Sequence, residues 1–293
     1  MSKKKDLSYE DYSELRKSGQ DAGVVPEWMQ TAGLQMFMKK YLYQANDPRE
    51  QFERIARTMA KYAPIMLSNS DATCPIPTLL RTKQDFENYW YSKFFNVLWK
   101  GYLACSTPLL ANTGTDRALP VSCSGGIPID DSVLGFSEAA TEVAMLTKNG
   151  FGTAVDLSNI RHRGSEFKGG GKAGGVLPVA EWMDFVTTNV SQGASRRGAV
   201  AVYLDIHHKD FYELAEYLQH NHDKLNVGWK VNAKFIEKLE AGNKEAHKRF
   251  AKMLYVKSLT GKGYIHFVDK ANALRGEAYE KNNLNVSASN LCN

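Results

Sequence analysis

The pattern of apolar and polar positions divides the chain into a helical first third and a longer alternating remainder. Apolar side chains recur every three to four residues over 49–64 and over 83–103, which predicts two amphipathic helices. A further helix start is predicted at Val25-Pro26, because proline is favoured at the first helical position. Residues 1 to about 15 are charged and predict a frayed end. We therefore expect residues 1–105 to form a mainly helical region.

From residue 106 onward, short apolar runs alternate with helical patterns. The runs predict strands at 152–157, 199–204, 225–231 and 264–268. Helices are predicted between and around them at 132–148, 178–190, 210–219 and 233–256. Residues 106–123 are rich in Thr, Pro, Asn and Gly, which favours loops and short strands. The alternation predicts an α/β domain over residues 106–293.

Composition narrows the classes of function. The 293 residues are 43% hydrophobic with a formal charge of +5, and the lysines are spread along the chain, so a dedicated nucleic-acid-binding protein is disfavoured. No run of about 18 apolar residues and no signal peptide is present, which predicts a cytoplasmic protein without a membrane anchor. The four cysteines show no C-x-x-C spacing, and no metal site is expected.

Three polar motifs are open to more than one interpretation. The glycine cluster 169–175 lacks the Gly-Lys-Ser/Thr ending of a phosphate-binding P-loop and favours a flexible loop. Arg196 and Arg197 could clamp a phosphate or carboxylate, or form a solvated surface pair. His207 and His208 are adjacent and should point to opposite sides, which disfavours a shared metal ion.

Two cysteines stand among small polar residues instead of in apolar runs. Cys123 lies in Val-Ser-Cys-Ser-Gly, and Cys292 lies in Ser-Asn-Leu-Cys-Asn. A buried cysteine is usually only a small hydrophobe. Their surroundings instead favour redox or radical chemistry for these thiols.

Five segments, in this order along the chain, together resemble the large, catalytic subunit of class I-like ribonucleotide reductases. They are Ser106-Thr107-Pro108, then Ser122-Cys123, then Asp131-Ser132 followed by Gly150-Phe151-Gly152 and Ile160-Arg161, then Gln192 to Ala199, and finally Ser289-Asn290-Leu291-Cys292. The resemblance covers residues 106–293. It implies the first half of a ten-stranded α/β barrel, in which two five-stranded halves lie antiparallel, preceded by a helical region. About 105 residues precede Ser106-Thr107-Pro108, too few for the ATP cone of many members in addition to this helical region.

The resemblance also implies a reaction, the reduction of ribonucleoside diphosphates to deoxyribonucleotides. Cys292 matches the position of the thiyl radical, Cys123 matches one member of the reducing dithiol, and Asn290 matches a residue that hydrogen-bonds the substrate hydroxyls. No cofactor or metal is expected on this chain, since the radical is supplied by a metal-containing small subunit. Substrate contacts are expected from Thr107, Ser122, Cys123, Gly150, Asn290, Leu291 and Cys292.

Regulatory positions carry over in the same way. The resemblance implies a site for an ATP or deoxynucleotide effector, at a homodimer interface formed by the predicted helix 132–148. A loop containing Gln192, Arg196 and Arg197 is expected to relay the identity of the effector to the substrate site. The effector site is expected to comprise Asp131, Ser132, Val133, Arg161 and Lys168.

The sequence ends one residue after the position of the radical cysteine. Either the missing half is a separate polypeptide, as in a split large subunit, or the sequence is part of a longer chain. In both cases we expect activity only with the C-terminal half, the small subunit and a thioredoxin- or glutaredoxin-type reductant. Two alternatives are the adenosylcobalamin-dependent class of the same enzyme and a non-catalytic, nucleotide-binding regulatory fragment.

Overall fold

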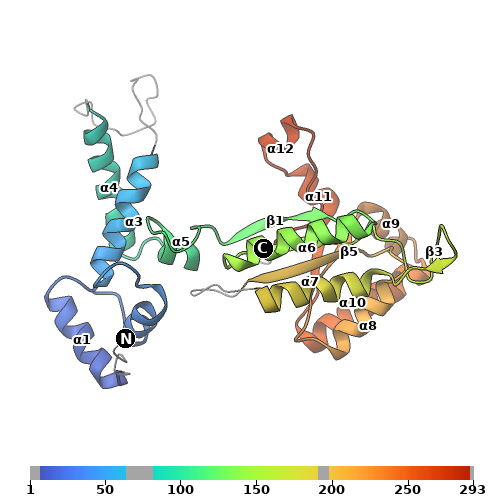
Figure 1. The fold of residues 1–293 in the computed structure, drawn as a ribbon, viewed down its shortest axis with the longest axis horizontal. Helices are drawn as coiled ribbons and strands as arrows, with labels where there is room; N and C mark the ends of the chain where they lie inside the picture. Colours follow the sequence, from blue (N-terminus) through green and yellow to red (C-terminus); the bar gives the residue numbers. More distant parts are fainter. Residues whose placement is uncertain (1–6, 64–81, 191–197, 291–293) are drawn as a thin grey trace. The chain divides into compact units, whose positions relative to one another are not determined.

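The computed structural model describes residues 7–63, 82–190 and 198–290 (Figure 1). The chain forms two compact units, Met1–Ser122 and Cys123–Asn293. The predicted boundary lies after residue 105, and the two units divide later, directly before the first strand of the sheet.

The first unit is helical, as predicted. Phe52 and Ile55 of one long helix pack with Leu98 of another, and all three side chains are buried. These two helices confirm the periodic patterns at 49–64 and 83–103, although Tyr62, the last residue of the first of them, is 85% exposed. The elements of this unit are α1 (Tyr9–Asp21), α2 (Thr31–Met36), a π-helix (Phe37–Tyr41), α3 (Pro48–Tyr62), α4 (Lys83–Trp99) and α5 (Thr107–Asn112).

Three local expectations for the first unit were wrong. The end predicted to fray forms α1 from Tyr9 onward, because Ser8 and Asp11 make a reciprocal capping box. The helix expected at Pro26 begins at Thr31 instead. Residues 107–112, expected as loop, form α5 with Pro108 in its first turn, where the missing N–H costs nothing.

The second unit contains a five-stranded parallel sheet in the order β1-β2-β5-β6-β7. All four predicted strands are present, and β1 is an additional strand that the pattern did not predict. The strands are β1 (Cys123–Pro128), β2 (Gly152–Asp156), β5 (Ala199–Asp205), β6 (Asn226–Val231) and β7 (Tyr264–Phe267). A separate two-stranded hairpin comprises β3 (Glu166–Phe167) and β4 (Gly171–Lys172).

The helices of this unit follow the strands in alternation. The single helix predicted over 233–256 is wrong: α9 ends at Glu240, Gly242 takes a left-handed conformation with φ of 75°, and Asn243 caps α10. The remaining predicted helices are confirmed with shifts of about two residues. The helices are α6 (Val133–Lys148), α7 (Val176–Val190), α8 (Phe211–His220), α9 (Ala233–Glu240), α10 (Lys244–Thr260), α11 (Val268–Ala273) and α12 (Glu277–Lys281).

The strand order explains why the sheet has two unlike faces. Each strand lies beside the one before it, and right-handed crossovers between such strands place the connecting helices on one side. On that side Val202, Leu204 and Trp229 are fully buried against helices α6 to α10. The opposite side carries Ala154, Ala201 and Tyr203. Five parallel strands covered by helices on one face confirm the predicted half-barrel.

Candidate functional site

Four of the five residues predicted to bind an effector line one cavity. Asp131, Ser132 and Val133 lie where β1 leads into α6, and Arg161 lies in the loop after β2. The cavity measures about 340 Å³ and is closed on its other side by the hairpin β3–β4. Its remaining walls are Phe136, Ile160, Phe167, Lys172, Ala173, Gly174 and Gly175.

The polar groups of this cavity suit an anionic ligand. The Ser132 hydroxyl caps α6 by accepting a hydrogen bond from the Gly135 N–H at 2.9 Å, so the helix begins at the cavity wall. The first turn of a helix presents N–H groups and a partial positive charge. Arg161 Nε lies 2.5 Å from Asp131 Oδ2, so this guanidinium is already neutralised in part.

Lys172, which the sequence analysis did not select, lines the cavity, whereas Lys168 is not among its lining residues. The register of the hairpin pairs Glu166 with Lys172 and Phe167 with Gly171. Phe167 folds over Gly171 so closely that a Cβ there would stand 2.3 Å from the ring. The glycine cluster is therefore part of a cavity wall, and the lysine within it was the available signal.

Two residues predicted to contact substrate, Cys123 and Gly150, lie at the opposite ends of the strands, where β1 and β2 begin. Cys123 is the first residue of β1 and is half-buried, and Gly150 is buried two residues before β2. The register aligns Cys123 with Gly152, and Gly152 with Ala199 at the start of β5. The cavity lined by Asp131 and Arg161 follows the other ends of β1 and β2, roughly 16 Å away along five residues of strand. Thr107 and Ser122 belong to the first unit, where Thr107 begins α5.

The segment that leads to Asn290 crosses the face of the sheet that the helices leave uncovered. Ala288 is 4% exposed and packs with Ala154, Ala201 and Tyr203. A Cβ at Gly126 of β1 would stand 2.6 Å from the Ala288 Cβ, so the segment lies directly on this strand. Asn290 is half-buried.

Tyr203 shows how enclosed this face is. Its side chain is 2% exposed, its ring lies 5.7 Å from the His266 ring, and it shares a hydrogen bond with Ser289. Burial raises the pKa of Tyr203 to about 12. Beside it, Lys230 Nζ lies 2.5 Å from Asp156 Oδ2, and both side chains are largely buried. The face that the helices leave uncovered, called the inner face from here on, therefore carries small apolar side chains around Tyr203 and one buried ion pair.

Several predicted residues lie outside the described residues. These are Leu291 and Cys292 at the predicted radical site and Gln192, Arg196 and Arg197 of the predicted specificity loop. Their neighbours fix where the loop is attached: α7 ends at Val190 and β5 begins at Ala199. Ala199, the first residue of β5, lies at the same end of the strands as Cys123.

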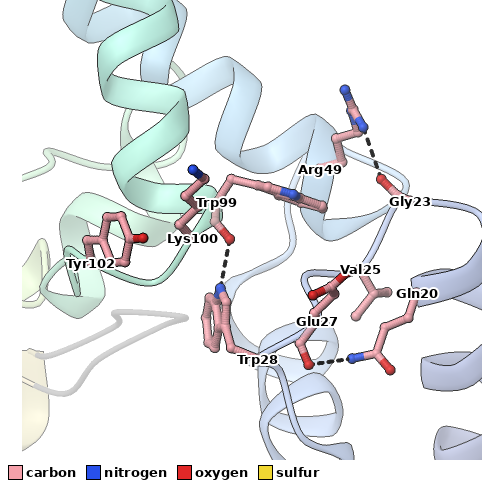
Figure 2. A pocket seen from close by; sticks show the side chains of 9 residues that line it. All are labelled: Gln20, Gly23, Val25, Glu27, Trp28, Arg49, Trp99, Lys100 and Tyr102. Atoms are coloured by element: carbon pink, nitrogen blue, oxygen red, sulfur yellow. Dashed lines mark hydrogen bonds between the residues drawn. The ribbon is translucent and has the colours of Figure 1, made fainter.

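A larger cavity, about 670 Å³, lies within the helical first unit (Figure 2). Its hydrogen bonds join its own walls: the Trp28 indole N–H donates to the Trp99 carbonyl at 2.7 Å, and Gln20 Nε2 donates to the Glu27 carbonyl at 2.9 Å. Arg49 likewise donates to the Gly23 carbonyl at 3.1 Å. These contacts tie the loop before α2 to α1, α3 and α4, and we interpret the cavity as a feature of packing.

The side chains of His207 and His208 contact different neighbours and do not converge on one site. His208 Nε2 lies 2.7 Å from the Ile160 carbonyl, while the His207 ring packs edge-on against Phe235.

Among the described residues, no helix is long and apolar enough to cross a membrane.

Comparison with known protein families assigns both units. The model described as "Ribonucleotide reductase, all-alpha domain" matches residues 28–118, and the model described as "Ribonucleotide reductase, barrel domain" matches residues 121–247. The two matches adjoin at the division between the helical unit and the sheet unit.

Individual relatives carry the same description. The chain is 35% identical over 132 residues to the ribonucleoside-diphosphate reductase large subunit of Arabidopsis thaliana, covering 44% of this chain and 16% of that protein. It is 29% identical over 165 residues to the subunit alpha of Synechocystis, covering 56% of this chain and 21% of that protein. The class Id ribonucleotide reductase alpha subunit of Actinobacillus ureae superposes with a TM-score of 0.73 at 29% identity, covering 91% of this chain and 45% of that chain. The chain therefore spans less than half the length of these relatives.

Proposed function

Because the chain belongs to the ribonucleotide reductase large-subunit family, we propose that it forms part of a catalytic subunit that reduces ribonucleoside diphosphates. The observation that carries the proposal is the course of residues 285–290. Ala288 lies on the inner face of the sheet against Gly126, three residues from Cys123. The chain thus brings the segment preceding Cys292 next to the strand that begins with the predicted redox cysteine.

The proposed reaction uses a radical on Cys292 and two further thiols as the reductant. A thiyl radical on Cys292 takes the 3′-hydrogen of the ribose, and the 2′-hydroxyl leaves as water. Two thiols supply two electrons and two protons and become a disulfide, after which the hydrogen returns from Cys292 to the 3′-carbon. Cys123 is one of the two thiols, and an external thioredoxin- or glutaredoxin-type dithiol reduces the disulfide. Asn290 hydrogen-bonds the ribose hydroxyls.

The remaining parts of the proposal concern partners. The radical originates on a metal-containing small subunit and passes to Cys292 through the large subunit. The large subunit dimerises through α6, on which Val133 is 77% exposed, Leu134 is 67% exposed and Met145 is 60% exposed. Exposed apolar side chains on one helix suit an interface between two copies.

The cavity at the start of α6 is the effector site in this proposal. A deoxynucleoside triphosphate or ATP places its phosphates at the helix N-terminus, near Arg161 and Lys172. In this proposal, nucleotide binding there acts on residues 191–197, the segment that connects α7 with β5 in the sequence. The two nucleotide sites are thereby coupled along the strands.

Replacement of Cys292 by Ser tests the catalytic assignment. The chain is combined with the rest of the large subunit, the small subunit and a dithiol reductant, and conversion of CDP to dCDP is measured. We expect Cys292→Ser to abolish turnover, since an alcohol cannot form a comparable radical. Cys105→Ser is the matched control, because Cys105 is half-buried in the helical unit and has no role in the proposal. Unchanged turnover by Cys292→Ser would support a purely regulatory fragment and refute the catalytic proposal.

A further inference from the structure

Asp210 occupies a helix-capping position but does not cap its own helix. It directly precedes α8, where an aspartate normally accepts a hydrogen bond from an N–H of the first turn. No such side-chain bond is present, although the residue is only 5% exposed. A buried carboxylate must find other donors, since leaving it unsatisfied is costly.

The donors come from both ends of the loop that carries the hairpin β3–β4. The Arg163 N–H lies 3.0 Å from each carboxylate oxygen of Asp210, and the Val176 N–H lies 3.1 Å from Oδ2. The residues between these two points include Lys172 to Gly175, which line the effector cavity. The Asp210 carboxylate therefore connects Arg163 and Val176, the two ends of the segment that contains the cavity-lining residues 172–175.

The hydrogen bond between Asp210 and Val176 also connects helix α7 with the segment that follows strand β5. Val176 is the first residue of α7, so Asp210 caps that helix from outside it. Asp210 itself follows β5 by five residues. Helix α7 and strand β5 are the elements on either side of residues 191–197, the predicted specificity loop.

Gly175 makes the closure sterically possible. Its φ of 78° is one that side chains rarely adopt, and a Cβ there would stand 2.4 Å from Asp210 Oδ2 and 2.8 Å from the Arg163 nitrogen. Any side chain at this position would push the carboxylate away from the loop.

We propose that Asp210 is the positioning residue of the effector site: it holds the loop 163–176 closed and so sets the affinity of the cavity for a nucleotide. The inference rests on the proposed function and deepens it, because it names the residue through which the shape of the cavity is tied to α7 and β5. Asp210 does not contact the ligand and acts through the loop.

The test compares three variants of the chain. Asp210→Asn removes the negative charge that both loop amides share, and wherever its NH2 group replaces a carboxylate oxygen it turns N–H groups toward the Arg163 N–H, which contacts both oxygens. Gly175→Ala displaces the carboxylate from the opposite side without changing its charge. Glu213→Gln is the matched control, because Glu213 pairs with the exposed Arg163 side chain and leaves the loop amides untouched.

Two quantities are measured for each variant. Hydrogen exchange of the backbone amides over 161–176 reports on loop closure without nucleotide, and calorimetric titration with dTTP and Mg²⁺ reports on affinity. We expect amide exchange in Asp210→Asn and Gly175→Ala to be at least about tenfold faster and dTTP binding to be about tenfold weaker, as the loss of a charged hydrogen bond implies. Glu213→Gln should match the unmodified chain in both.

Different results would contradict the role of Asp210 and the proposed effector site. Unchanged loop exchange in both Asp210→Asn and Gly175→Ala would overturn the inference, as would an opened loop with unaltered dTTP affinity. If the unmodified chain binds no dTTP, the effector proposal fails, while the exchange data still decide whether Asp210 closes the loop. If Asp210→Asn does not fold, the Gly175→Ala comparison carries the same decision.

Discussion

Replacing Lys172 or Lys168 by glutamine should show which of the two lysines contributes to nucleotide binding: the one that lines the cavity or the one that was predicted from the sequence. Lys172 lines the cavity and Lys168 does not, although both lie in the same hairpin. Arg161 is already paired with Asp131 at 2.5 Å, so Lys172 is the cation with charge left to offer among the described residues that line the cavity. We expect Lys172→Gln to weaken the binding of a deoxynucleoside triphosphate and Lys168→Gln to leave it unchanged.

The size of the effect follows from the geometry. A phosphate charge about 4 Å from an ammonium gains ~4 kcal/mol at an effective dielectric constant of about 20. Lys172 is exposed, and solvent screening reduces this to about 1 kcal/mol, or roughly a fivefold loss of affinity. Calorimetric titration of dTTP measures it, and the difference should shrink as salt is raised. Equal weakening by both variants, or weakening by Lys168→Gln alone, would refute the reasoning.

Two further predictions concern the inner face of the sheet. Gly228→Ala should destabilise the chain by about 1–3 kcal/mol in urea denaturation, because the new Cβ would stand 2.2 Å from the Tyr203 ring; Gly125→Ala, with open space around it, should be near neutral. Burial, reinforced by Lys230, lowers the pKa of His266 below the unfolded value of about 6.5, so the unfolded chain takes up the proton first and stability falls as the pH drops below that value. His266→Leu should therefore lose less stability than the unmodified chain between pH 7 and pH 5, and equal losses would contradict this.

Helices and strands with a clear cap residue or a regular apolar period could be predicted from the sequence. Elements that depend on pairing with a distant part of the chain could not. Helix α6 has a cap residue, Ser132, and a continuous 3.6-residue period, and both are visible in the sequence. Strand β1 contains two glycines and no alternation, so only its pairing with β2 makes it a strand. The break between α9 and α10 was missed because the helical period continues across Gly242.

The candidate site shows the same division. The four predicted effector residues that line the cavity were found by resemblance of short motifs that flank strands. Which lysine of the glycine cluster faces the cavity depends on the hairpin register, which the sequence does not specify. Asp210 was missed for a different reason: its partners, Arg163 and Val176, lie 47 and 34 residues away and are backbone amides without a sequence signature.

The inner face of the sheet links the fold to the proposed radical chemistry. Successive strand residues point to opposite faces, so an apolar run such as 199–204 conceals the fact that one face meets helices and the other meets residues 285–290. On that second face water is excluded well enough to raise the pKa of Tyr203 to about 12, and the Asp156 carboxylate has Lys230 as its counterion. A thiyl radical needs surroundings closed to water and to stray hydrogen donors. Ala288 and Ser289 contact this enclosed face, so the last described residues lie in surroundings of the kind that the proposed radical chemistry requires.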